Sequence, residues 1–306
     1  MKTEKGATIG LLLVILLPAS SAAQGEGTRV YLPAPAGTNV FSATFMDLKG
    51  TFNFAQDILV AGASIESRIG VPSYVRFFPI AGRLSELWVS PILGSVQGSA
   101  SAGAVSVRVP RISGLADPYL GIRVGLTGAP GLVPAQFAKY KQTFQVYGLF
   151  GVTPPIGKYS GSSVLNLGTN RWAFRGGVPL VAPFGDAKRP VWLEVVPSVT
   201  FFTVNADPFG PGQRRSQAPL VVVENHLSYN LTTPFWAALD LRGQSGAGTT
   251  TDGVSDGNTI RQLGGGATVG YQVNKALGLQ TTYGRILAKR GSEKGDMWRL
   301  RGTYAF

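Results

Sequence analysis

The sequence contains no cysteine, which excludes disulfide bonds, thiolate metal sites and a cysteine nucleophile. It contains a single histidine, so a multi-histidine metal site cannot form and few routes to acid–base catalysis remain. Charged residues make up only 14% of the chain, whereas they make up about a quarter of an ordinary soluble domain. These shortages favour a protein that is not an enzyme and that uses no cofactor or metal.

Long apolar runs are also missing beyond the N-terminus, where no segment approaches about 18 uninterrupted apolar residues. The early run Ile9–Leu17 follows Lys2 and Lys5 and precedes the small residues Ser21–Ala23. Because this run is too short to span a membrane as a helix, it predicts a cleavable secretory signal peptide over residues 1–23. Residues 24–37, rich in Gly, Pro and Ala, would then form an irregular N-terminal lead.

The chain is strongly basic, with a formal net charge of +12. Nucleic-acid-binding proteins share this property, but they gather their Lys and Arg residues on one face. Here these residues are scattered along a chain that is predicted to be exported. We therefore expect attraction to anionic lipid head groups or anionic solutes, and no nucleic-acid partner.

The last ten residues, Met297–Phe306, alternate between two kinds of side chain. In an extended strand, the positions that hold Trp298, Leu300, Gly302, Tyr304 and Phe306 share one face, and Arg299 and Arg301 lie on the other. About ten residues also suffice for a tilted strand to cross a bilayer. The segment resembles the terminal strand of bacterial outer-membrane β-barrels, where a final Phe and alternating hydrophobic residues are recognised by the barrel-assembly machinery. The resemblance implies that Trp298, Leu300, Tyr304 and Phe306 form this assembly signal.

Similar patterns recur along residues 38–306 and predict about twelve strands. They are Thr38–Met46, Ser73–Phe78, Leu84–Ser90, Asp117–Leu126, Phe144–Val152, Arg171–Val181, Val191–Val204, Leu220–Tyr229, Phe235–Gln244, Ile260–Tyr271, Leu277–Ile286 and Met297–Phe306. Long connections at 47–57, 98–116, 155–170, 206–216, 246–258 and 288–295 alternate with short ones, except at 129–140, where Pro134–Tyr140 predicts one or two helical turns. Outer-membrane barrels have an even strand number, long loops outside and short turns inside. The pattern predicts an all-β fold, a transmembrane antiparallel up-and-down β-barrel of about twelve strands in the bacterial outer membrane.

Alternation also assigns side chains to the barrel lumen. Outward Leu239 and Leu241, for example, place Asp240 and Arg242 inside. The residues predicted to line the lumen and to select solutes are Arg171, Arg175, Glu194, Glu224, His226, Asp240, Arg242, Arg299 and Arg301. Two interpretations stay open. The arginines could select anionic or aromatic solutes, or the carboxylates could pair with them and fill a narrow lumen of mixed charge.

Two further groups have the composition of a chemical site. His226 and Ser228 are two residues apart on one strand face, as in outer-membrane phospholipase A, but here they are predicted to face the lumen near a short turn. We therefore favour a structural polar pair over a nucleophile and its base. Asp252, Asp256 and Asn258 could supply oxygen ligands to calcium, but their spacing is not that of a calcium-binding loop and is typical of turns.

The middle of the chain carries a more specific resemblance, in Gly114–Pro118, Pro155–Tyr159 and Asn166–Phe174. These segments resemble the outer-membrane transporter family labelled putative MetA-pathway of phenol degradation, although Ala116 stands where that family more often has Gly. The resemblance implies an outer-membrane barrel associated with the degradation of aromatic compounds. We expect a passive channel for small solutes, with aromatic or hydrophobic compounds among them, whose partners are outer-membrane lipids, the barrel-assembly machinery and the solutes. The alternatives are a closed structural or interaction barrel that acts through its extracellular loops and, third, an outer-membrane lipid hydrolase.

Overall fold

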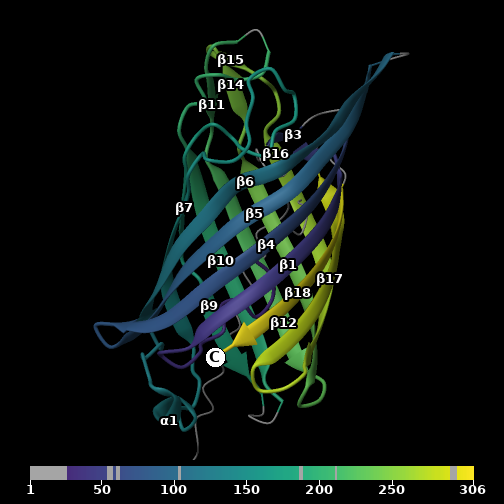
Figure 1. Ribbon diagram of the computed structural model, residues 1–306. Helices are drawn as coiled ribbons and strands as arrows, with labels where there is room; N and C mark the ends of the chain where they lie inside the picture. The colour runs from purple at the N-terminus through teal and green to yellow at the C-terminus, as the bar shows by residue number, and fades with distance from the viewer. Residues whose placement is uncertain are drawn as a thin grey trace, which may run out of the picture.

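The computed structural model describes residues 26–53, 58–59, 63–102, 105–185, 189–210, 212–289 and 295–306, and the predicted signal peptide lies outside them. These residues form a closed barrel of tilted strands (Figure 1). The barrel strands are β1 (Asn39–Gly50), β4 (Ala63–Ile80), β5 (Arg83–Ala102), β6 (Val105–Thr127), β7 (Gln145–Thr153), β8 (Ala173–Gly177), β9 (Leu180–Phe184), β10 (Val191–Phe202), β12 (Leu220–Asn230), β13 (Phe235–Gly246), β16 (Ile260–Gln272), β17 (Leu277–Lys289) and β18 (Gly295–Ala305).

Each strand pairs antiparallel with the next one in the sequence, and β18 pairs with β1, from Val40 opposite Ala305 to Gly50 opposite Gly295. β8 and β9 together occupy one position, because both pair with β7 on one side and with β10 on the other. Pro179, which has no backbone N–H to donate, lies in the break between them. The prediction of a twelve-stranded up-and-down barrel is therefore confirmed.

The predicted long connection at 98–116 is wrong. β5 continues to Ala102 and β6 begins at Val105, so these two strands form an extended hairpin. The connection predicted at 47–57 is also partly strand, since β1 runs to Gly50 and is followed by the short strands β2 (Phe52–Asn53) and β3 (Ile58–Leu59). The Ser, Gly and Ala residues of 97–102 show no alternation, but backbone pairing does not require it, and tertiary context overrides such weak propensities.

The remaining connections carry little regular structure. β11 (Arg215–Gln217), β14 (Thr249–Thr251) and β15 (Val254–Ser255) form a small sheet in the long loops, at the end of the barrel away from the C-terminus (Figure 1). The helical turn predicted at 134–140 is confirmed as α1 (Pro134–Phe137). No helix within the described ranges is long and apolar enough to cross a membrane.

The outer face of the barrel is apolar, with aromatic side chains near both ends of the strands. Toward the C-terminal end of the barrel, Phe41 lies between its register partners Tyr74 and Tyr304, and all three are exposed. Toward the other end, Tyr283 lies opposite Trp298, with ring centroids 4.9 Å apart. Water-soluble monomers rarely expose so large an apolar surface, whereas outer-membrane barrels carry an apolar band flanked by aromatic girdles.

Residues 26–38 form no strand, and we call this segment the lead; its contacts with inward side chains place residues 26–34 inside the barrel. Its Tyr31 is fully buried and packs edge-on against Trp88, with ring centroids 5.7 Å apart. The cluster around Tyr31 consists of inward side chains of several strands, namely Phe77, Leu84, Trp88, Tyr147, Leu149, Val181 and Val196. The lead therefore supplies part of the barrel's own interior packing.

Candidate functional site

The lead is held by a carboxylate on the lumen side of β10. The two oxygens of Glu194 accept hydrogen bonds from the backbone N–H groups of Arg29, at 2.8 Å, and of Tyr31, at 3.0 Å. Glu194 is completely buried, and Thr28 adds a hydrogen bond of 2.5 Å from its hydroxyl to Asp240. Irregular backbone inside a barrel has no strand partners, so Glu194 supplies acceptors that its buried N–H groups need, and Asp240 binds a side-chain hydroxyl of the same segment.

A second anchor comes from Glu86 and Arg123, which were not among the predicted lumen residues. The Arg123 guanidinium contacts both Glu86 oxygens and donates to the carbonyl of Tyr31 at 2.6 Å. It also lies over the ring of Tyr147, 4.1 Å from the centroid. Alternation could have found Glu86, because its neighbour Leu87 points outward within the predicted strand Leu84–Ser90.

A polar network crosses β12, β13 and β16 inside the barrel. His226 Nδ1 lies 2.6 Å from Asp240 Oδ1, its Nε2 lies 3.6 Å from Glu224 Oε2, and Thr268 donates to Asp240 Oδ2 at 2.6 Å. The register explains this cluster, because His226 and Asp240 are direct cross-strand partners. The Ser228 hydroxyl accepts a hydrogen bond from Arg29 at 3.0 Å. Both nitrogens of His226 thus face carboxylates, which is the geometry of a structural network and not of a serine nucleophile with its base.

Of the predicted arginines, Arg175, Arg242, Arg299 and Arg301 line the barrel interior, whereas Arg171 lies just before β8, between the interior and the long loops. Arg175 pairs with Glu26 of the lead and lies 3.7 Å from Glu224, and Arg242 lies 3.5 Å from the same Glu224. Arg301 donates to the carbonyl of Glu26 at 2.6 Å. Carboxylates thus neutralise part of the positive charge, as one of the two interpretations held.

Arg299 and Arg301 also line open space, and their part in selecting solutes stays a prediction. A cavity of about 660 Å³ lies beside the lead. The charged part of its lining consists of Arg29, Arg175, Arg242, Lys275, Arg299 and Arg301 together with Glu26 and Glu224. Its apolar part includes Met46, Val71, Val75, Phe77, Trp88 and Ile92 of β1, β4 and β5, and Val30, Leu32, Pro33 and Ala34 of the lead. The residues predicted to line the lumen include none of these apolar side chains, because alternation had been applied mainly to strands with charged residues.

Two smaller cavities continue from the first one along the barrel. The next, of about 180 Å³, shares Glu26, Tyr119, Arg175 and Arg242 with it. It also shares Thr169 and Arg171 with a pocket of about 260 Å³ among the long loops. The cavities therefore form a series, with arginines at both junctions.

The three candidate calcium ligands stabilise the long loops, and Asp252 joins its own loop to the 206–216 connection. Asp252 accepts hydrogen bonds from the backbone N–H groups of Gln213 and Arg214, each at 2.9 Å. Asp256 accepts from the hydroxyl of Thr249, and Asn258 accepts from the backbone N–H of the same residue at 2.8 Å. These contacts are typical of turn stabilisation.

On β18, the residues of the predicted assembly signal point outward. Trp298, Leu300, Tyr304 and Phe306 are each more than half exposed. Their role in assembly stays a prediction.

Comparisons with known proteins agree with this geometry. Residues 49–298 match the model of the family described as "Putative MetA-pathway of phenol degradation". Among solved structures, the chain is similar to an outer membrane channel from Pseudomonas putida F1, at 20% sequence identity and a TM-score of 0.74, covering 92% of this chain and 99% of that one. It is also similar to the translocator domain of autotransporter NalP from Neisseria meningitidis, at 11% identity and a TM-score of 0.53, covering 89% and 90%. No curated protein matches the chain.

These structural similarities show the fold, an outer-membrane type of β-barrel. The match to the family model extends over most of the chain, from within β1 to within β18. The chain therefore belongs to the family described as "Putative MetA-pathway of phenol degradation".

Proposed function

We propose that the protein is a passive outer-membrane channel for small solutes that combine an apolar or aromatic part with a polar group. The observation that carries this proposal is the cavity beside the lead, whose lining is apolar along β4 and β5 and rich in arginine on β8, β13 and β18. Such a lining can contact both parts of an amphipathic solute at once. Membership of a family described by phenol degradation and the similarity to an outer membrane channel support the same function.

The size of the barrel is consistent with restricted passage. Barrels of about eight strands are filled by side chains, whereas those of sixteen or more enclose an aqueous pore. In this barrel the lead occupies part of the interior, so solutes pass beside it or displace it. Small solutes are favoured over large ones, and the arginines at the cavity junctions favour anions, because charges interact strongly where the effective dielectric constant is low.

A closed barrel that acts through its outer loops is the second candidate. The burial of the lead among inward side chains favours it, since a lumen that is always filled conducts nothing. Conductance separates the two candidates directly.

The test is single-channel recording of the purified protein in planar bilayers, with a blocked variant and a matched control. Ser73 lines the cavity, so Ser73→Trp should reduce conductance and solute flux strongly. Its neighbour Tyr74 is exposed on the outer face, so Tyr74→Trp should leave both unchanged. Absence of conductance and solute flux in the wild-type protein would favour the closed barrel. Equal effects of the two variants would show that solutes do not cross this cavity.

A further inference from the structure

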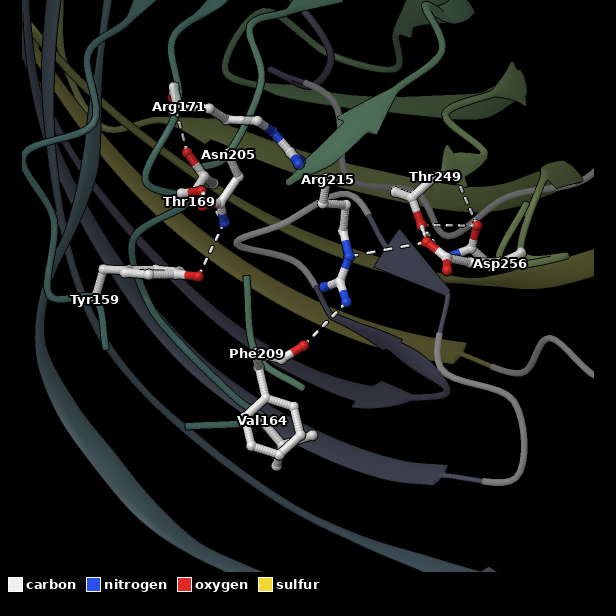
Figure 2. A pocket seen from close by; sticks show the side chains of 10 residues that line it. Tyr159, Val164, Thr169, Arg171, Asn205, Phe209, Arg215, Thr249 and Asp256 are labelled. Carbon is white, nitrogen blue, oxygen red and sulfur yellow. Dashed lines mark hydrogen bonds and ion pairs between the residues drawn. The ribbon is translucent and has the colours of Figure 1, made fainter. Parts of the chain in front are cut away.

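Three long connections, from segments 159–171, 205–215 and 249–258, enclose the pocket of about 260 Å³ at the end of the barrel away from the C-terminus. Figure 2 shows Arg171 and Arg215 extending into this pocket from different segments. The volume lies just below the range of about 300–1,000 Å³ that is typical of drug-sized ligands. The pocket therefore suits a molecule the size of a single ring.

Neighbouring residues fix the positions of the two arginine side chains. The Arg171 side chain is buried, and its guanidinium lies over the ring of Phe202, 4.9 Å from the centroid. Arg215 donates through Nε to the hydroxyl of Thr251 at 3.0 Å and through Nη2 to the carbonyl of Phe209 at 3.1 Å. A guanidinium has five N–H donors in a planar fork, so these two bonds leave Arg215 with donors for an anion.

The charge of the lining is positive. Its one carboxylate, that of Asp256, lies 3.8 Å from Arg215 Nε and accepts hydrogen bonds from the hydroxyls of Thr249 and Thr251 through the same oxygen. Two guanidiniums against one carboxylate leave an excess of one positive charge among the lining residues. A neutral amide, that of Asn205, adds polarity and is fixed by hydrogen bonds to Tyr159 and Asn170, each at 2.9 Å.

The rest of the lining includes an apolar side. Phe209 and Val164 are each about two-fifths exposed, and Figure 2 shows their side chains together on the side of the pocket away from Arg171. The pocket thus presents guanidiniums to one end of a ligand and apolar surface to the other. Carboxylates are the anions whose geometry matches the guanidinium fork and that commonly occur on small rings.

We propose that this pocket binds a small aromatic carboxylate by Arg171 and Arg215 before the solute enters the lumen. Arg171 also lines the next cavity, so a bound anion lies at the start of the series. The passage of the bound solute from this pocket into the lumen rests on the proposed channel function, but binding to the pocket does not.

Binding is measured on the purified full barrel in detergent micelles, by fluorine NMR titration with 4-fluorobenzoate and, separately, with the neutral 4-fluorobenzamide. Empty micelles correct for partitioning. The wild-type protein should bind the carboxylate and not the amide. Arg215→Gln and Arg171→Gln should each weaken binding about 10- to 100-fold, the range for loss of a charge-assisted hydrogen bond.

Arg214→Gln is the matched control, because Arg214 is exposed, adjacent in sequence and outside the lining. Heat-modifiable migration on gels confirms that each variant folds, and Arg215→Gln alone suffices if Arg171→Gln does not fold. The proposal is overturned if the amide binds as well as the carboxylate, if Arg214→Gln weakens binding as much as Arg215→Gln, or if no carboxylate binds. A barrel that conducts without binding would overturn only this site, and one that binds without conducting would overturn only the channel.

Discussion

Glu86 and Arg123 are register partners on β5 and β6, and the Arg123 guanidinium contacts the two Glu86 oxygens at 2.6 and 2.9 Å. Both side chains are almost completely buried. The same guanidinium donates to the carbonyl of Tyr31, so one ion pair joins the barrel wall to the lead.

Removal of one partner of this pair should destabilise the barrel. Arg123→Met leaves the Glu86 carboxylate buried and unpaired, which should lower the free energy of unfolding by about 3–5 kcal/mol. The double variant Glu86→Leu/Arg123→Met should recover much of that loss, because no unpaired charge remains. Urea-induced unfolding in detergent micelles measures both values. A double variant as unstable as the single one would contradict this account.

Release of the lead should increase conductance. Glu194→Gln keeps the side-chain volume but replaces one of the two acceptor oxygens that bind the N–H groups of Arg29 and Tyr31. We expect weakening of the attachment by about 1.5–3 kcal/mol and more frequent large conductance steps. Glu66→Gln, on β4 and bound to Gln97, is the control with the same chemistry. Unchanged step size and frequency in Glu194→Gln would show that the lead does not limit flow.

Ion selectivity should depend on the arginines of β18. Arg299→Gln/Arg301→Gln removes two positive charges from the cavity lining, so the reversal potential under a salt gradient should shift toward cation preference. The double control Arg68→Gln/Arg285→Gln removes two exposed charges and should leave the reversal potential unchanged. Equal shifts in the two double variants would indicate a general surface-charge effect.

The topology predicts which connections are reached from outside the cell. Protease sites inserted at 160–163 or 252–257 lie in long connections and should be cleaved on intact cells. A site at 274–275, in the short turn between β16 and β17, should be protected until the outer membrane is permeabilised. Cleavage at 274–275 on intact cells would show that the barrel has the opposite orientation in the membrane.

Assembly should depend on the outward aromatic face of β18. Phe306→Ala removes an exposed ring that stacks on Tyr304, with centroids 5.9 Å apart, while the backbone bonds between Phe306 and Asn39 can persist. Because the change spares the barrel interior, we expect less barrel in the outer membrane but normal stability of the fraction that folds. Phe41→Ala removes an outward ring on the adjacent β1 and serves as the control. An unaltered yield of Phe306→Ala would show that this residue has no part in recognition.

The sequence predicted best those strands whose outer face meets lipid. The outward positions of Leu239 and Leu241 predicted that Asp240 and Arg242 point inward. This inference works because side chains alternate with a period of two and the lipid-facing surface must be apolar. The pairing of 98–102 with 105–109 was missed, since the Ser, Gly and Ala residues of 98–102 carry little pattern. The lead could not be placed at all, because irregular backbone has no period and its contacts with Glu194 and Arg123 depend on residues far away in the sequence.

The pairing of β1 with β18 has a consequence for folding. It joins residues as far apart as Asn39 and Phe306, separated by 267 positions, so it closes the longest loop of any strand pairing in the described barrel. Loop-closure entropy makes such pairing slow, and until it forms, the curved sheet has two open edges with unpaired N–H and C=O groups. Such edges can pair with other chains. A chain that stops before β18 would expose β1 and β17 together, and we expect it to aggregate rather than to form a smaller pore.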